Sequence, residues 1–459
     1  MNLARVVLAC ALAGWACVVA CGDVVSQPIG AGAAGDAGGG DVLVHSEGAV
    51  DVVDAAGDAS AFCSGQGPIT LPGMNMCLGD LANVFRFAAC ACDALDVSGT
   101  LYTDSFDGPP DGGASSFELA SIAANGEVST NSKTNVGGSV WSGGADAPSR
   151  AGVTLRGNGT ILHDVRSGGP VEVGGTYLVQ GDVWSNGNVT LDTGASLAVV
   201  GTVHVPAGDS ATGVQGSVVN GPVQVTPPCD CSSPIDVGAV VALFASDNDD
   251  SVAHLSPSST LDGTVSLPCG RYYVASIAGA IVTLEVKGRV ALFVSGGVNV
   301  TQSLTVKLAP SAELDLFVAG DFSVMGSLAI GDANAAARTR LYVGGTTLSL
   351  SATASPLTAD VYAPNATIQL AADLEMWGAL FAKSMQFSGA FTLHYDTSVL
   401  QLPASGGCEP PGKSCNSCND CPAAAPACKS GTCSPCATTA DCCAPLECES
   451  GQCVLATTQ

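Results

Sequence analysis

Glycines at turn positions recur about every 20 residues through the middle of the chain, and this repeat constrains the fold more than any other feature. In the first half, successive members lie 20, 24, 20 and 20 residues apart: Gly137, Gly157, Gly181, Gly201 and Gly221. Most are followed within three residues by a short run in which apolar residues alternate with others, as in a half-buried strand. A single unit of this length cannot bury its inward side chains. Successive units must therefore stack, and with no helical stretch between strands this predicts a parallel β-helix.

The second half of the chain repeats more plainly. Each unit reads as a strand, a corner with Gly, Asp or Asn, a second strand and another corner. The units begin 24, 25, 20 and 19 residues apart, at Leu292, Leu316, Leu341, Val361 and Leu380. Leucine-rich repeats would need an Asn/Leu ladder, which is absent, and a propeller would need a period nearer to about 40 residues. A β-sandwich or jelly roll remains the alternative, because isolated alternating strands look alike in all of these folds.

Breaks in the repeat divide the chain into regions. We expect a signal peptide at 1–20, an acidic Gly/Ala-rich tether at 21–60, a disulfide-braced N-terminal cap at 61–95, the solenoid at 96–407 and a cysteine-rich tail at 408–459. The cap is expected because an open solenoid end exposes unpaired strand groups. The repeat is interrupted near 226–275, where Ile235 to Ala245 is the most helical run and Asp236 is its N-terminal acid. We interpret this interruption as a helical insertion packed on the side of the solenoid.

The N-terminus has the features of an export signal. Arg5 precedes an apolar run of 15 residues from Val6 to Ala20, which is too short to span a membrane. The run ends in Ala20-Cys21-Gly22, which resembles a bacterial lipobox, where the cysteine is lipidated and becomes the first residue of the mature protein. We predict lipidation of Cys21 and attachment to a membrane; the alternative is an ordinary secretory signal cleaved nearby. Gly22 after the cysteine favours the outer membrane.

The cysteine count also indicates export. The chain has 21 cysteines, and 18 remain when Cys10 and Cys17 leave with the signal and Cys21 is lipidated. An even number fits complete disulfide pairing in an oxidising compartment. The expected disulfide cysteines are Cys63, Cys77, Cys90, Cys92, Cys229, Cys231, Cys269, Cys408, Cys415, Cys418, Cys421, Cys428, Cys433, Cys436, Cys442, Cys443, Cys448 and Cys453. We expect the three cysteines of the insertion to pair among themselves, with Cys408 as the fourth partner.

The tail contains two units with the same spacing. Cys428-Lys429-Ser430-Gly431-Thr432-Cys433 matches Cys448-Glu449-Ser450-Gly451-Gln452-Cys453. Such short segments cannot fold on an apolar core, so disulfides must supply their stability. The close spacing of Cys415, Cys418 and Cys421 also resembles a zinc site, but the shared repeat and the compartment favour disulfides.

Acidic residues dominate the charge of the chain. The formal net charge is −26, which repels phosphate backbones and excludes nucleic acid as an expected partner. The densest cluster contains Asp247, Asp249 and Asp250, which are calcium candidates through their oxygen atoms. The cluster lacks the mid-loop glycine and final glutamate of an EF-hand loop, and its alternative is a solvated turn at the end of the insertion helix. No cofactor is expected.

No sequence motif predicts catalysis. Residues 407–414 match a phosphate-binding loop by letter, but Pro410 and Pro411 lack the N–H groups that such a loop presents to phosphate. His-Glu-x-x-His and Gly-x-Ser-x-Gly are both absent. Polysaccharide lyases and hydrolases built on β-helices need clustered carboxylates, or Lys and Arg with bound calcium, on one face. The chain has only 15 Lys and Arg residues. Asp182 and Asp321 instead occupy equivalent corner positions, where they are expected to form turns, and we predict that the protein is not an enzyme.

Several stretches carry a family resemblance: Phe85-Arg86-Phe87, Cys90-Ala91-Cys92, 103–107, Leu267-Pro268-Cys269-Gly270-Arg271-Tyr272-Tyr273 and 361–366. They resemble an uncharacterised exported domain of Gram-negative lipoproteins and of proteins linked to pilus assembly, over roughly 85–400. The resemblance implies a β-solenoid and brings no catalytic residues. The solenoid is distantly similar to bactofilins, which are cytoplasmic and lack disulfides, so their filament formation transfers poorly. The tail resembles Dickkopf-type cysteine repeats by spacing alone.

These features lead to one expectation and two rivals. We expect a non-enzymatic structural or adhesive lipoprotein in the cell envelope, at the outer membrane or cell surface, with a rigid solenoid body and a tail that contacts a surface glycan or protein. The first rival is a glycan-binding or glycan-cleaving β-helix. The second is an envelope scaffold that self-assembles through exposed solenoid ends. The oligomeric state is left open.

Overall fold

A computed structural model of the chain describes residues 62–65, 67–69, 84–106, 120–144, 152–232, 234–350, 356–401, 427–429, 432–434, 438, 446–449 and 452–455.

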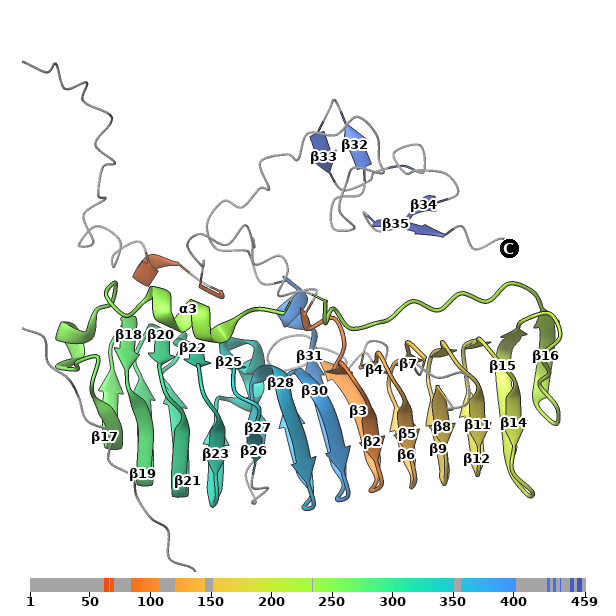
Figure 1. Cartoon of the computed structure of the whole chain (residues 1–459), viewed down its shortest axis with the longest axis horizontal. Helices are drawn as coiled ribbons and strands as arrows, with labels where there is room; N and C mark the ends of the chain where they lie inside the picture. The colour runs from red at the N-terminus through yellow and green to blue at the C-terminus, as the bar shows by residue number, and fades with distance from the viewer. Residues whose placement is uncertain are drawn as a thin grey trace, which may run out of the picture. The chain divides into compact units, whose positions relative to one another are not determined.

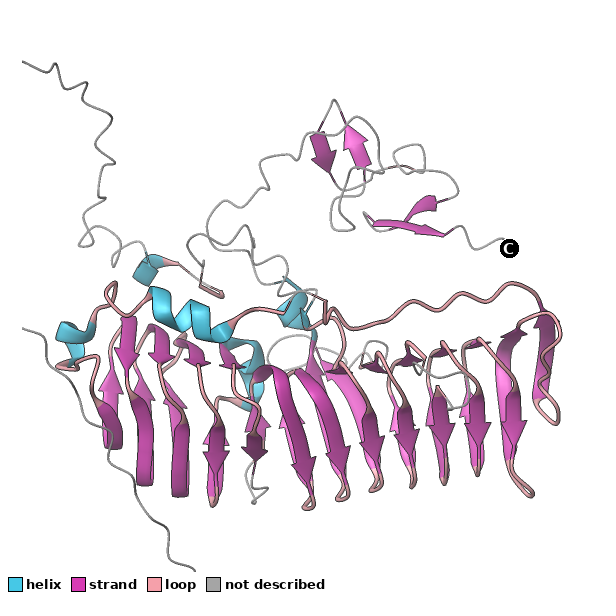
Figure 2. Cartoon of the chain, in the orientation of Figure 1, coloured by secondary structure: helices cyan, strands magenta, loops and turns pink. Residues whose placement is uncertain are grey.

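The body of the protein is a parallel β-helix, as predicted, and each rung has three faces, here called A, B and C (Figures 1 and 2). Face A contains β18 (Gly270–Val274), β20 (Arg289–Val294), β22 (Glu313–Val318), β25 (Thr339–Val343), β1 (Ala89–Ala91), β4 (Ile122–Ala124), β7 (Val140–Ser142), β10 (Val165–Ser167) and β13 (Val183–Ser185). Face B contains β23 (Phe322–Val324), β26 (Leu348–Leu350), β2 (Leu95–Val97), β5 (Val128–Thr130), β8 (Val153–Leu155), β11 (Val171–Val173) and β14 (Val189–Leu191). Face C contains β24 (Ser327–Ile330), β27 (Leu357–Thr358), β29 (Leu374–Trp377), β31 (Phe391–Asp396), β3 (Leu101–Phe106), β6 (Thr134–Val136), β9 (Asn158–Ile161) and β12 (Thr176–Val179).

Longer strands bend around a corner and belong to two faces. Three of them join faces B and C: β17 (Thr260–Leu267), β19 (Ser276–Val286) and β21 (Val298–Leu308). Two join faces A and B: β28 (Asp360–Leu370) and β30 (Leu380–Phe387). Two join faces C and A: β15 (Ser196–Val205) and β16 (Gln215–Asn220).

Alternate residues of the strands point inward and stack in columns that fill the solenoid. On face B, Ile277 pairs in register with Val298, Val298 with Phe322 and Phe322 with Leu348. All four side chains are buried. Because one rung supplies only one layer of each column, every rung depends on its neighbours for burial and for backbone hydrogen bonds.

The rungs do not follow the order of the sequence. β1 pairs with β4 on one side and with β30 on the other, and β3 lies in the same way between β6 and β31. The solenoid therefore begins at β17, runs to β31, continues with β1 and ends at β16 (Figure 1). We call β1–β16 the first half-solenoid, β17–β31 the second half-solenoid, and the contact of β1, β2 and β3 with β30 and β31 the seam.

This order corrects the expectation that residues 61–95 cover an end of the solenoid. The segment contains β1, which has a strand on each side and lies inside the continuous sheet. The expectation failed because repeat spacing identifies the rungs without telling which rungs are neighbours. The first rung in the sequence is thus covered by the last one.

The chain has to return along the solenoid between β16 and β17, and it does so as an extended strap, residues 221–232 and 234–236 (Figure 1). The strap leads into α3 (Val237–Leu243), where the carboxylate of Asp236 accepts a hydrogen bond from the N–H of Ala239, so the predicted helix and its N-terminal acid are confirmed. Phe244 then stacks on Phe293 of face A at 4.0 Å. The insertion therefore packs on the outer side of face A.

Three short 3-10 helices and two hairpins complete the described structure. The 3-10 helices are η1 (Asp250–Ala253), η2 (Ala333–Arg338) and η3 (Thr397–Gln401). In the tail, β32 (Ala427–Lys429) pairs antiparallel with β33 (Thr432–Ser434), and β34 (Leu446–Glu449) pairs with β35 (Gln452–Leu455). Each of the two units with shared cysteine spacing therefore forms one hairpin.

Candidate functional site

Six of the expected disulfide cysteines are paired in the structure. The bridges are Cys63–Cys269, Cys90–Cys229 and Cys92–Cys231. This corrects the expectation that Cys229, Cys231 and Cys269 pair among themselves and with Cys408, because each of the three reaches a cysteine of the N-terminal segment instead. The remaining predicted cysteines lie outside the residues whose side chains are described: Cys21, Cys77, Cys408, Cys415, Cys418, Cys421, Cys428, Cys433, Cys436, Cys442, Cys443, Cys448 and Cys453.

The disulfides indicate an oxidising, non-cytoplasmic location. In the part of the chain that the structure describes, no helix is long and apolar enough to cross a membrane.

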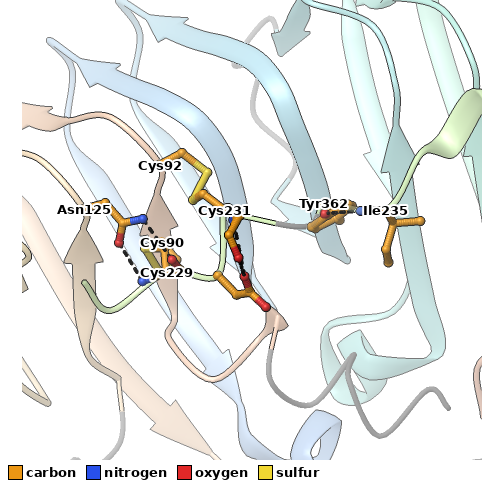
Figure 3. The surroundings of a disulfide bond; sticks show 9 residues. Cys90, Cys92, Asn125, Cys229, Cys231, Ile235 and Tyr362 are labelled. Atoms are coloured by element: carbon orange, nitrogen blue, oxygen red, sulfur yellow. Dashed lines mark hydrogen bonds between the residues drawn. A yellow bond between two sulfur atoms is a disulfide. The ribbon is translucent and has the colours of Figure 1, made fainter. Parts of the chain in front are cut away.

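Two of the bridges fasten the strap to the first rung of the first half-solenoid (Figure 3). Cys90 is the central residue of β1 and Cys92 follows its last residue, and the two cysteines match the spacing of their partners in the strap. Next to them, the amide of Asn125 donates to the carbonyl of Cys229 at 2.9 Å and accepts from its N–H at 2.8 Å. The strap is thus fixed to the solenoid close to the seam. The equal Cys-x-Cys spacing in the two segments is the sequence signal for this pairing.

The acidic cluster covers one end of face A. The carboxylate of Asp249 accepts a hydrogen bond from the N–H of Arg271 at 2.8 Å, and that of Asp250 accepts from the N–H of Tyr273 at 2.8 Å. Asp247 lies 3.4 Å from the guanidinium of Arg271. These oxygens bind the free edge of β18, the first strand of face A, so the calcium candidates are engaged with the protein itself. Among the described residues, no group of three or more acidic, His or Cys side chains is arranged to hold a metal ion.

Single aspartates at the corners have a similar structural role. Asp182 accepts a hydrogen bond from the N–H of Thr202 in the next rung at 2.7 Å, and Asp321 accepts one from the N–H of Thr346 at 2.9 Å. Both residues were expected to form turns, and both do so by joining successive rungs. Such carboxylates are occupied by backbone donors and do not form a pair that could act as general acid and base.

A buried ionic cluster, which sequence analysis did not find, lies in the second half-solenoid. The guanidinium of Arg340 contacts the carboxylate of Asp315 at 2.5 Å and that of Glu313 at 2.9 Å, and it donates to the carbonyl of Ala337 at 2.7 Å. Arg340 is 0 % exposed and Asp315 is 1 % exposed. A buried charge needs a buried partner of opposite charge, because removal of one partner leaves the other desolvated and unpaired.

The same cluster holds the N-terminal segment against the solenoid. Arg289 donates to the carbonyl of Phe62 at 2.9 Å and to that of Gly67 at 2.8 Å. The N–H of Gly67 donates to Glu313 at 2.9 Å, and the N–H of Ile69 donates to Asp315 at 3.1 Å. These charges therefore order the chain just before the first rung. They are structural, and they leave no acid or base facing a cleft.

Asp360 is the most isolated acid of the described structure. It is 0 % exposed, and neither of its carboxyl oxygens has a hydrogen-bond partner within the described residues. Burial raises the pKa of Asp360 well above its ordinary value, and the charge of Asp396 raises it further. The raised pKa means that the fold favours the neutral form of this carboxyl. Asp360 pairs in register with Arg340 on the outer side of face A and is fully covered there, so a substrate has no access to it.

A cluster of polar and aromatic groups marks the outer surface of the seam. His394 lies with Nδ1 2.6 Å from Asp104 and with Nε2 3.6 Å from Glu375. The ring of Trp377 stacks on the imidazole at 4.1 Å. Because both imidazole nitrogens face carboxylates and one ring face is covered, His394 has no free nitrogen for a substrate. The Asp104–His394 contact joins β3 to β31 and therefore fastens the seam.

Aromatic side chains on the outer side of face A also stack from rung to rung. Trp184 and His204 are parallel at 3.7 Å, and the guanidinium of Arg166 lies 5.1 Å from the ring of Trp141. A sugar ring packs against an exposed aromatic face, and here the faces already contact neighbouring rungs. Most described Tyr and Phe side chains are buried. This arrangement supports the solenoid and does not form a platform for glycan stacking.

A shallow polar trough of about 670 Å³ crosses three rungs at the corner between faces B and C. It is lined by Asn131, Ser132, Lys133, Gly157, Asn158, Gly159, Thr160 and Thr176. Gly157 has a φ of +84°, and a Cβ there would lie 2.4 Å from the carbonyl oxygen of Ser132, so glycine allows the two rungs to approach closely at this corner. Amides, hydroxyls and one ammonium group suit hydrogen bonding to sugar hydroxyls, but the lining includes no carboxylate for hydrolysis.

One family model matches the chain, a domain of unknown function (DUF7305), over residues 232–402. The match spans α3 and the second half-solenoid, which is less than half of the chain. It agrees with the expectation of an uncharacterised domain, whereas the finer resemblances to pilus-linked proteins, bactofilins and Dickkopf-type repeats are not supported by it. Neither the curated proteins nor the solved structures include a match to the chain.

Proposed function

We propose that this protein is a non-enzymatic structural or adhesive lipoprotein of the cell envelope, held at the outer membrane through Cys21, with the solenoid as its rigid body. One observation above all supports this proposal. The charged side chains that could carry chemistry are engaged in contacts between rungs, at the seam, in the acidic turn and in the buried cluster. A body built in this way is suited to hold its shape and to present other parts of the chain.

The covalent bonds of the body support the same role. Parallel strand pairing satisfies the hydrogen-bonding groups of the backbone along the solenoid. Three disulfides fasten the strap and the N-terminal segment to it. Disulfides form and persist in oxidising compartments, so they can hold these contacts together outside the cytoplasm. The protein would therefore act as a durable spacer at the cell surface, and the cysteine-rich tail would make the contact with a surface glycan or protein.

Surface attachment of the full-length chain tests the adhesive role. The purified protein is compared with a variant that lacks residues 408–459 in binding to cells and to a glycan array, and circular dichroism verifies that the β-helix of the variant is intact. We expect binding by the full chain and loss of binding by the variant. Equal binding by both proteins would refute adhesion through the tail. Turnover of any polysaccharide by the full chain would refute the non-enzymatic role.

Glycan binding by the body itself is the second candidate, because the trough offers several hydrogen-bonding groups in a row. Replacement of Lys133 and Asn158 by alanine should then abolish binding to a glycan that the full chain retains. Arg156→Ala is the matched control, because Arg156 is exposed close to the trough but its charge is directed to Glu172 and Asp192. Retention of glycan binding by the double variant would exclude the trough.

A further inference from the structure

The last strand of the solenoid, β16, is an open edge. Within the described residues it pairs only with β15, and all six of its residues are exposed. Val218 is 41 % exposed and Val219 is 49 % exposed. The strand Gln215–Asn220 contains no charged residue and no proline. Edge strands are normally protected from pairing with other chains by charge, proline or a covering segment. β16 has neither charge nor proline, and no segment of the described structure pairs with its free edge.

The opposite end of the solenoid is closed on the face where β16 would have to pair. In a head-to-tail stack, the face A part of β16 would continue the sheet by binding β18 of the next copy. The N–H groups of Arg271 and Tyr273 in β18 already donate to Asp249 and Asp250, and the carbonyl of Arg271 accepts from the N–H of Asp249. The acidic turn therefore occupies the place of the incoming strand, and head-to-tail growth is blocked on that face.

The seam shows that ends of this solenoid can dock without a direct chain connection. The strands β1, β2 and β3 add to the edge formed by β30 and β31, although about 290 residues of chain separate Asp104 from its partner His394. The contact consists of strand pairing, continued inward columns, the Asp104–His394 contact, and hydrogen bonds from Tyr395 to the carbonyl of Phe85 and from Thr397 to that of Phe106. An exposed three-faced end is thus a surface that a similar end can complete.

We propose that a second copy of this chain docks on β16, so that two solenoids meet end to end about a two-fold axis with their β16 strands antiparallel. Rotation about such an axis reverses the direction of the partner strand, so pairing has the antiparallel pattern. Val218 continues the inward column above Val203, and Val219 lies outward above His204. Side chains alternate between the two faces of a strand, so inward residues of one β16 strand lie opposite inward residues of the other.

This dimer deepens the proposed structural role, on which it rests, because it doubles the length of the rigid body. The two-fold contact uses the same strand on both copies and therefore closes on itself. Because the acidic turn occupies face A at the other end, that face cannot add a further copy, and we expect the assembly to stop at two.

Analytical ultracentrifugation of the purified full-length chain in detergent tests the proposal. We expect a monomer at low concentration and twice that protein mass at high concentration. Val219→Lys places one ammonium group from each copy on the same outer face of the paired β16 strands and should raise the dissociation constant at least about tenfold. Val200→Lys is the matched control, because Val200 is 72 % exposed but lies at the corner of β15, one strand in from the free edge, and it should dimerise like the unaltered chain. Association through detergent micelles would affect all variants equally.

A mixture of Val219→Lys with Val219→Glu separates the two-fold contact from other modes and from misfolding. Opposite charges at the same position attract only if the two copies of residue 219 lie near each other, so the mixture should restore the dimer that Val219→Lys loses. A chain that stays monomeric at every concentration, an equal loss in Val200→Lys, or species larger than a dimer would overturn the proposal. If the chain stays monomeric and shows no polysaccharide turnover, the proposed dimer is refuted and the proposed structural role is not.

Discussion

Loss of both strap disulfides should destabilise the protein far more than twice the loss of one. Cys90–Cys229 and Cys92–Cys231 each join residues 139 apart in the sequence, and they lie two residues from each other in both segments. Either bridge alone therefore closes the same large loop. When one bridge is present, the second closes only a small additional ring of about five residues. The entropy that the unfolded chain loses by this closure stabilises the folded protein by about 2 kcal/mol.

By the same relation, the first bridge, which closes the large loop, stabilises the folded protein by about 5 kcal/mol. This figure is an upper bound, because Cys63–Cys269 encloses the same stretch and already confines it. Replacement of one pair by alanine should thus lower the free energy of unfolding by about 2 kcal/mol, and replacement of both pairs should lower it by up to about 7 kcal/mol. The excess over additivity is about 3 kcal/mol.

Denaturant unfolding of the oxidised protein measures these differences. The four proteins to compare are the unaltered chain, Cys90→Ala with Cys229→Ala, Cys92→Ala with Cys231→Ala, and the fourfold variant. The cooperativity of each transition is followed by the slope of the unfolding curve, because repeat proteins can unfold in parts. A fourfold variant that loses no more than the sum of the two double variants would refute the reasoning, since it would mean that the two bridges do not close one shared loop.

Three further predictions concern charges. Arg340→Met should destabilise the protein by about 3–5 kcal/mol, because Asp315 is left buried and unpaired. The control Arg156→Met, at an exposed ion pair, should destabilise it by less than about 1 kcal/mol. Equal losses of stability in denaturant unfolding would contradict burial of the cluster. The pKa of Asp360 in the folded protein is raised above its ordinary value of 3.8, so the folded protein loses stability as pH rises from the ordinary to the raised value. Asp360→Asn should therefore raise the melting temperature at pH 8 and leave it unchanged at pH 3. A variant that is destabilised at pH 8 would show that the carboxylate is ionised and bound. Millimolar Ca²⁺ should leave the melting temperature unchanged, because the acidic turn binds β18, and a shift of several degrees would show that Asp247, Asp249 and Asp250 bind the ion instead.

The sequence was sufficient to predict the solenoid and its insertion. Turn glycines near a 20-residue period, alternating strands and the absence of helices between them are consequences of stacked rungs, and they can be read locally. The helix after Asp236 was predictable for the same reason, because its N-terminal acid and apolar run lie within ten residues.

The order of the rungs could not be predicted in this way. Every rung offers a similar edge to its neighbours, so the repeat pattern does not tell whether β1 follows β31 or begins the solenoid. The pairing of Cys90 with Cys229 and of Cys92 with Cys231 depends on that order and was missed with it. The buried contact of Arg340 with Asp315 was also invisible, because both residues lie in strands where alternating charge normally indicates a solvent-facing position.

A distance across the seam tests the central claim that the first rung in the sequence stacks on the last. Asp96 of β2 and Gln386 of β30 are partners in register, although 290 residues separate them in the chain (386 − 96). Spin labels on Asp96→Cys and Gln386→Cys, measured by pulsed electron paramagnetic resonance, should lie within about 20 Å of each other, which is one strand spacing plus the two label tethers. If the rungs were stacked in sequence order, on the order of ten rungs would separate the labels, and a distance of roughly 50 Å would contradict the account.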